Sequence, residues 1–267
     1  MADVWAVFNE LDDEAQARLA TVLETRGATG QQRAMRRAFL ESVAFPPAAR
    51  VLEVGCGTGV LTRVLAGWRG VGEVVGVDLA PALVARARQL AAGLSNVRFE
   101  EGDARALRLD DDSFDVVVFD STLSHVSGPE RALDEAFRVM RADGWLAVFD
   151  GDYATATVAL GPDDPLQTCV DAMMKASVTD RHVVRRLVSL ALGAGFRSPV
   201  LRSHGLAETE PADYMLTVVD RGADLLGSTG SAGPDLVEAL KHEARQRVAG
   251  GRFFGHIAYG SLAARKP

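Results

Sequence analysis

A chain of 267 residues with 48% hydrophobic and 24% charged residues is long enough for one α/β domain that buries its core without disulfide bonds. The formal net charge of −7 gives no general affinity for phosphates, so we expect no nucleic-acid partner, and the only two cysteines, Cys56 and Cys169, are too far apart for a metal site. The acidic start of the chain does not match a signal peptide, and no apolar run reaches the roughly 18–20 residues of a membrane span, which predicts a cytoplasmic protein without a membrane partner.

The first part of the chain, residues 3–44, is predicted to be helical, because apolar residues recur there at helical spacings among charged ones. Gly27 and Gly30 divide this region into two helices, and the prolines at 46–47 end it. We expect residues 1–45 to form a helical lid over the domain that follows.

Short apolar runs then alternate with amphipathic patterns, which is typical of βαβ units and a parallel sheet buried on both faces. We expect residues 46–150 to form the cofactor-binding core of the protein. The predicted strands are 50–54, 73–77, 97–99, 115–119 and 145–149, and the predicted helices are 58–68, 81–92 and 129–140.

The pattern changes after residue 150. Residues 151–180 are irregular at first and then helical, and we expect them, with an insertion at 206–250, to cap the substrate site of a single domain that spans 1–267. The insertion is too short to fold alone. The other predicted elements are a helix at 181–194, a strand near 197–203, two helices within 206–250 and a last strand at 253–264.

A glycine-rich turn, Gly55, Gly57 and Gly59, joins the first predicted strand to the next helix. Glycines let a ligand approach the backbone closely, and a helix N-terminus offers free amide donors. The dinucleotide fingerprint would need another glycine where Val60 stands, and the carboxylate of Glu53 attracts an ammonium but repels a pyrophosphate. The turn therefore suits a cationic amino acid group better than a dinucleotide.

Acidic residues also end the next three strands. Asp78, at the tip of the second strand, can accept hydrogen bonds from ribose hydroxyls, and Asp103, after the third, can accept one from the amine of adenine. Asp120 ends the fourth strand, in the crevice where open α/β sheets bind ligands, although it could instead bond to the loop backbone.

In this order and spacing, residues 45–150 resemble the class I S-adenosylmethionine-dependent methyltransferases, whose first motif the segment VLEVGCGTG matches. The stretches 122–126, 129–133 and 140–145 resemble the ubiquinone/menaquinone-methyltransferase-like branch, which includes many tailoring enzymes of bacterial natural-product pathways. The resemblance implies an α/β, Rossmann-like sheet that is mostly parallel with an antiparallel last strand. It also implies S-adenosylmethionine as cofactor and S-adenosylhomocysteine as its product.

The resemblance also assigns roles to individual residues around the cofactor. Arg36, in the preceding helix, would pair with the methionine carboxylate, but a solvated helix face explains Arg33, Arg36 and Arg37 equally well. The remaining implied cofactor contacts are Glu53, Gly55 and Gly57, within the turn completed by Gly59, for the methionine part, Asp78 and Leu79 for the ribose and the adenine edge, and Asp103 and Ala104 for the adenine.

Two residues are candidates for catalysis. His125 lies just past the fourth strand and could remove a proton from the acceptor as the methyl group arrives, but a structural hydrogen bond explains it as well. Tyr153, with Asp150 and Asp152, follows the fifth strand, where these residues either line the acceptor pocket or cap the loop. We expect no metal site.

The resemblance implies transfer of a methyl group from S-adenosylmethionine to a small metabolite. We expect this metabolite to be largely apolar, because the candidate lids are rich in Leu, Val, Ala and Met. The methylated atom can be oxygen, nitrogen or carbon. An alternative is a non-methylating enzyme, such as a cyclase, that keeps the same cofactor pocket. The sequence makes no prediction of the oligomeric state.

Overall fold

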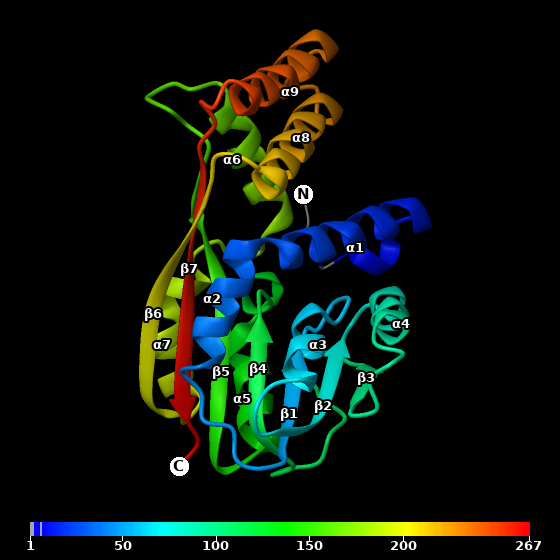
Figure 1. The fold of residues 1–267 in the computed structure, drawn as a ribbon, viewed down its shortest axis with the longest axis vertical. Helices are drawn as coiled ribbons and strands as arrows, with labels where there is room; N and C mark the ends of the chain where they lie inside the picture. The colour runs from blue at the N-terminus through cyan, green and yellow to red at the C-terminus, as the bar shows by residue number, and fades with distance from the viewer. Residues whose placement is uncertain (1–2, 6) are drawn as a thin grey trace.

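The computed structural model describes residues 3–5 and 7–267, which form a seven-stranded sheet in the order β3-β2-β1-β4-β5-β7-β6 (Figure 1). Strands β1 to β5 are parallel to one another, whereas β7 runs antiparallel to both of its neighbours. The predicted mostly parallel sheet with an antiparallel last strand is therefore confirmed. The strands are β1 Ala49–Val54, β2 Val71–Asp78, β3 Val97–Glu101, β4 Phe114–Asp120, β5 Met140–Thr157, β6 Arg197–Glu208 and β7 Gly255–Arg265.

The helices also follow the sequence pattern, with short 3₁₀ turns at Phe8–Glu10 and Leu123–His125. The division within 3–44 lies at Thr29, whose side chain accepts a hydrogen bond from the Gln32 amide and so caps the second helix. None of the described helices is both long enough and apolar enough to cross a membrane. The helices are α1 Asp13–Ala28, α2 Gly30–Leu40, α3 Val60–Ala66, α4 Pro81–Leu90, α5 Pro129–Val139, α6 Leu166–Ser177, α7 Val183–Gly193, α8 Asp213–Ser228 and α9 Pro234–Ala249.

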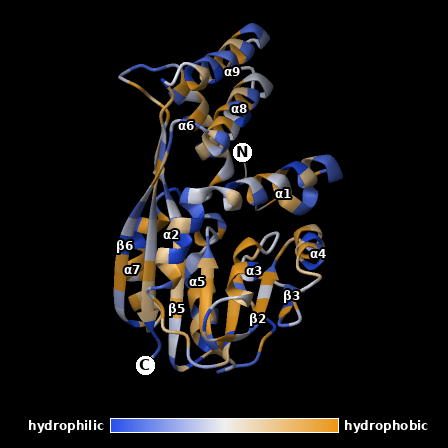
Figure 2. Ribbon diagram, viewed as in Figure 1, coloured by the Kyte–Doolittle hydropathy of each residue, from blue (hydrophilic) through white to orange (hydrophobic). Residues whose placement is uncertain are grey.

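The central strands of the sheet are buried on both faces. Consecutive strand residues point to opposite sides, so that Val51 of β1 packs with α2 and α3, while its neighbour Leu52 packs with α5 and α7. Figure 2 shows the central strands as largely hydrophobic, with hydrophilic residues on the outer helices. This double burial explains why the strands are nearly continuous apolar runs in the sequence.

Strands β5 and β6 extend furthest beyond their predicted ranges. Strand β5 continues to Thr157 because β7 pairs with it as far as His256, so residues 151–157, which we expected to be irregular, are extended backbone. Strand β6 likewise continues to Glu208, so the insertion begins with a strand rather than a helix. These long strands extend beyond the parallel part of the sheet, where α6, α8 and α9 gather at one end of the molecule (Figure 1).

Candidate active site

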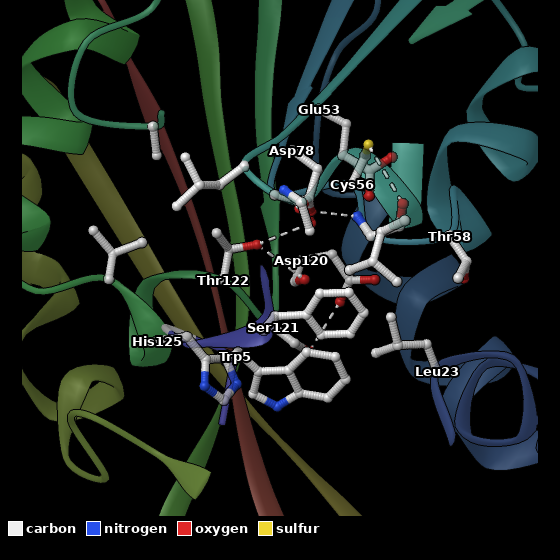
Figure 3. Close-up of a pocket in the computed structure, with 18 of the residues that line it drawn as sticks. Trp5, Leu23, Glu53, Cys56, Thr58, Asp78, Asp120, Ser121, Thr122 and His125 are labelled. Carbon is white, nitrogen blue, oxygen red and sulfur yellow. Dashed lines mark hydrogen bonds between the residues drawn. The ribbon is translucent and has the colours of Figure 1, made fainter. Parts of the chain in front are cut away.

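A cavity of about 270 Å³ opens at the carboxyl ends of β1, β2 and β4 (Figure 3). Helix α1 lies over these strand ends (Figure 1). Open α/β sheets bind their ligands at this position. Gly59 and Tyr153 are not among the residues that line it. The predicted site residues that do line it are Arg36, Glu53, Gly55, Gly57, Asp78, Leu79, Asp103, Ala104, Asp120 and His125.

The glycine-rich turn has its shape because neighbouring elements come very close. Gly55 has φ +74°, and a Cβ there would lie 2.5 Å from Oγ1 of Thr122, which donates a hydrogen bond of 3.1 Å to the Val54 carbonyl. Gly59 has φ +78°, and a Cβ there would lie 2.8 Å from the Phe99 ring. Gly59 therefore allows α3 to begin close to β3 and does not itself face the cavity.

Asp78 organises the loop beside this turn. Its carboxylate accepts hydrogen bonds from the amides of Gly57 at 2.7 Å and Ala80 at 2.9 Å. Burial raises the pKa of this carboxyl group, and the backbone hydrogen bonds oppose that rise. Each oxygen still has a lone pair for a further donor, such as a sugar hydroxyl.

Asp103 lies nearer the rim of the cavity. Arg105 binds both of its oxygens, through Nε at 3.0 Å and Nη2 at 2.8 Å, and this side-chain bonding lowers the pKa of Asp103. Asp103 is therefore ionised near neutral pH and available as a hydrogen-bond acceptor.

Glu53 lies deepest among the acids, with 2% of its surface exposed. Thr62 donates a short hydrogen bond to it, but burial dominates and raises the pKa of Glu53 to about 8. An acid with this pKa exchanges its proton near neutral pH, and a cation beside it would favour the ionised form.

Arg36 belongs to the site and not to a solvated helix face. It is buried and its Nε donates to Asp120 at 2.6 Å, with both side chains 5% exposed, whereas Arg33 and Arg37 are exposed. The Nη1 atom of Arg36 is buried and has no hydrogen-bond partner in the described part of the chain. A buried guanidinium nitrogen without a partner suits a carboxylate ligand.

His125 meets the start of the chain at the mouth of the cavity. Its Nδ1 lies 2.9 Å from Oδ2 of Asp3, which also accepts hydrogen bonds from the amide and hydroxyl of Thr179. The Trp5 ring lies beside His125, with ring centroids 6.1 Å apart, and stacks on Phe8 (Figure 3).

Two acids of β5, Asp150 and Asp152, stabilise the neighbouring loops and helices. Asp150 accepts hydrogen bonds from the amide and hydroxyl of Ser124, and Asp152 pairs with Arg185 at 2.8 Å. Tyr153 is buried behind His125, with ring centroids 6.1 Å apart. Of the two alternatives, lining the acceptor pocket or capping the loop, the second therefore describes Asp150 and Asp152.

Several residues of the first 26 line the cavity although their sequence pattern indicated only helix. Their role depends on how α1 folds over the sheet, and no local motif marks them. Glu24 of α1 accepts hydrogen bonds from Thr58 at 2.6 Å and Arg63 at 2.8 Å, which ties α1 to the glycine-rich turn. The residues among the first 26 that line the cavity are Trp5, Phe8, Asn9, Leu23 and Arg26.

We compared the sequence with known protein families and with curated proteins. Residues 52–148 match a family model described as a methyltransferase domain. The demethylmenaquinone methyltransferase of Clavibacter sepedonicus is 32% identical over 157 residues, 59% of this chain and 60% of that protein. The chain spans about half to three fifths of the length of the curated relatives that it matches most strongly.

Solved structures share the fold. The YcgJ protein from Bacillus subtilis aligns with a TM-score of 0.58 at 20% identity, over 86% of this chain and 97% of that one. The [4+2]-cyclase SpnF aligns with a TM-score of 0.61 at 22% identity, over 100% of this chain and 98% of that one.

The chain thus contains a class I methyltransferase domain, of the class whose methyl donor is S-adenosylmethionine. Several of its sequence relatives are menaquinone or ubiquinone/menaquinone methyltransferases, and the family resemblance predicted from the motifs is confirmed.

Proposed function

We propose that the protein binds S-adenosylmethionine in the cavity and transfers its methyl group to a small, largely apolar metabolite, such as a natural-product intermediate. The observation that carries the proposal is that one cavity is lined both by a buried acid, Glu53, and by Arg36, which has a buried guanidinium nitrogen with no partner within the described residues. The carboxylate of Glu53 suits the ammonium of the donor's methionine part, and the guanidinium of Arg36 suits its carboxylate.

The remaining cofactor roles follow from position in the cavity. Asp78 would accept hydrogen bonds from the ribose hydroxyls, with Leu79 against the adenine edge, and Asp103 with Ala104 would contact the adenine. Gly55 and Gly57 leave room for the donor to approach the backbone. Asp120 would hold Arg36 in place rather than touch the donor.

His125 would act as general base for an acceptor that must lose a proton. If Asp3 accepts a hydrogen bond from Nδ1–H, the lone pair of the ring lies on Nε2, which can then take a proton from the acceptor. The sulfonium supplies an already activated methyl group, so the protein contributes mainly alignment and exclusion of water. Residues 1–45 as a lid, and 151–180 and 206–250 as caps, would provide that enclosure.

The alternative, a cyclase that keeps the cofactor pocket, uses the same fold, as the likeness to SpnF illustrates. Product mass separates the two functions, because methylation adds one CH₂ to the acceptor and cyclisation leaves its mass unchanged.

The first test of the proposal is calorimetric titration with S-adenosylmethionine, S-adenosylhomocysteine and NAD in parallel. We expect Kd values in about the micromolar range for the two sulfur compounds, which corresponds to a favourable binding free energy of about 8 kcal/mol. We expect no binding of NAD. Binding of NAD alone would contradict the proposed donor.

A further inference from the structure

All three tyrosines of the chain lie near one arginine. Tyr153 of β5, Tyr214 of α8 and Tyr259 of β7 are each buried in the neighbourhood of Arg26. Gln32 of α2 lies next to Tyr259, but the two side chains do not meet with the geometry of a hydrogen bond. We name these five residues the tyrosine cluster. Elements far apart in the sequence thus bring every tyrosine of the chain to one place.

Polar atoms of the tyrosine cluster lack partners. Gln32 and Tyr259 are 0% and 1% exposed, yet both amide atoms of Gln32 and the hydroxyl of Tyr259 have no hydrogen-bond partner among the described residues. The same is true of Nε of Arg26. Buried polar atoms nearly always have partners, so a group of them without any indicates a place where a polar ligand completes the bonding.

The tyrosine cluster is rich in donors and poor in negative charge. Burial raises the pKa of Tyr153 and of Tyr259, so both hydroxyls stay protonated and can donate. The neighbouring carboxylates are already occupied, Asp120 by Arg36 and Asp150 by Ser124. The group that fits between a guanidinium and protonated tyrosines is an oxygen anion.

The tyrosine cluster is continuous with the cavity. Arg26 lines the cavity and Tyr153 lies directly behind His125, which lines it as well. We propose that the tyrosine cluster is the acceptor subsite, and that it binds an acceptor through an acidic oxygen, a carboxylate or an enolate, on an otherwise apolar body. This inference rests on the proposed function, and it adds a negatively charged group to the largely apolar acceptor that we expect.

A competing role for Arg26 is to bind the carboxylate of the methyl donor. Arg36 is the better candidate for that role, because its Nη1 is buried without a partner among the described residues and it lines the same cavity as Glu53, the acid suited to the donor's ammonium. Removing the charge of Arg26 should therefore change acceptor binding and leave donor binding intact.

The test uses benzoate and 2-naphthoate as anionic probes, each compared with its neutral amide, titrated into protein saturated with S-adenosylhomocysteine. We expect at least one carboxylate to bind wild-type protein about tenfold or more tightly than its amide. Arg26→Gln should abolish this preference and Tyr259→Phe should reduce it, while the Kd for S-adenosylhomocysteine changes less than about twofold. Arg33→Gln, on the exposed face of α2, is the matched control and should keep the preference.

Each other result contradicts a different statement. Equal binding of carboxylates and amides by the wild-type complex, or an unchanged preference in Arg26→Gln, would overturn the acceptor subsite. A loss of about tenfold or more in S-adenosylhomocysteine affinity in Arg26→Gln would assign Arg26 to the donor instead. If wild-type protein fails to bind S-adenosylhomocysteine at all, the proposed function fails first and this inference with it. Tyr259→Phe, which keeps the ring stacked on Phe149, tests the cluster should Arg26→Gln not fold.

Discussion

At the scale of single residues, Glu53 determines how donor binding depends on pH. Its pKa of about 8 means that it carries a proton over most of the neutral range, whereas an ammonium beside it favours the carboxylate. Binding must then release a proton below pH 8, so the affinity for S-adenosylhomocysteine should rise between pH 6 and pH 8, by at most about tenfold per pH unit.

Calorimetry in buffers of different ionisation enthalpy measures this proton directly. We expect close to one proton released at pH 7 by the wild-type protein and a clearly smaller release by Glu53→Gln, which cannot titrate. If both proteins release the same number of protons, the proton comes from a group other than Glu53.

His125 and Asp3 form the second prediction at this scale. His125→Ala should lower kcat about 10²–10⁴-fold if the imidazole removes a proton from the acceptor. Asp3→Asn should lower kcat less and leave the Kd for S-adenosylhomocysteine unchanged, because Asp3 positions the ring and does not itself touch the reacting atoms. A lower melting temperature with unchanged kcat in both variants would instead mean that the pair only fastens the start of the chain.

At the scale of elements, the cap depends on a close approach between α6 and α8. A Cβ on Gly222 of α8 would lie 2.0 Å from the carbonyl oxygen of Cys169 in α6, and the backbone cannot move aside as a side chain can. Gly222→Ala should gain about 1 kcal/mol in helix propensity, but forcing the helices apart should cost more, for a net loss of about 1–3 kcal/mol.

Gly193, in α7, is the matched control, because a Cβ there would meet nothing within 4 Å. Chemical denaturation should therefore show Gly193→Ala to be as stable as the wild type or slightly more stable. Equal stability of Gly222→Ala and the wild type would show that α6 and α8 can separate without cost.

The elements also show which parts of the fold a sequence can predict. The first five strands were found because each is a local apolar run, and the glycine-rich turn because its residues are contiguous. The extension of β5 to Thr157 was missed because it exists only through pairing with β7, about a hundred residues later. The same limit applies to the site. The acids at strand ends follow from local order, whereas Arg26 reaches the cavity, and Asp3 reaches His125, only through the packing of α1 and the segment before it.

At the scale of the whole molecule, the cavity lies between the sheet and α1, and Glu24 is the residue that joins α1 to the glycine-rich turn beneath it. The ion pair with Arg63 is partly exposed, with 34% of the Glu24 side chain accessible, so solvent screening leaves it worth only about 1 kcal/mol. A loss of that size in Glu24→Ala should let α1 open more often without unfolding the sheet.

Hydrogen exchange followed by mass spectrometry tests this for α1. In Glu24→Ala we expect faster exchange confined to residues 13–28 and a roughly threefold to tenfold faster release of S-adenosylhomocysteine, because a lid held less firmly retains its ligand less well. Glu14→Ala is the control, since Glu14 lies on the same helix and, among the residues that the structure describes, pairs only with Arg18 at the surface. If both variants exchange and release ligand as the wild type does, α1 is a fixed wall of the cavity and not a lid, and the acceptor must enter elsewhere.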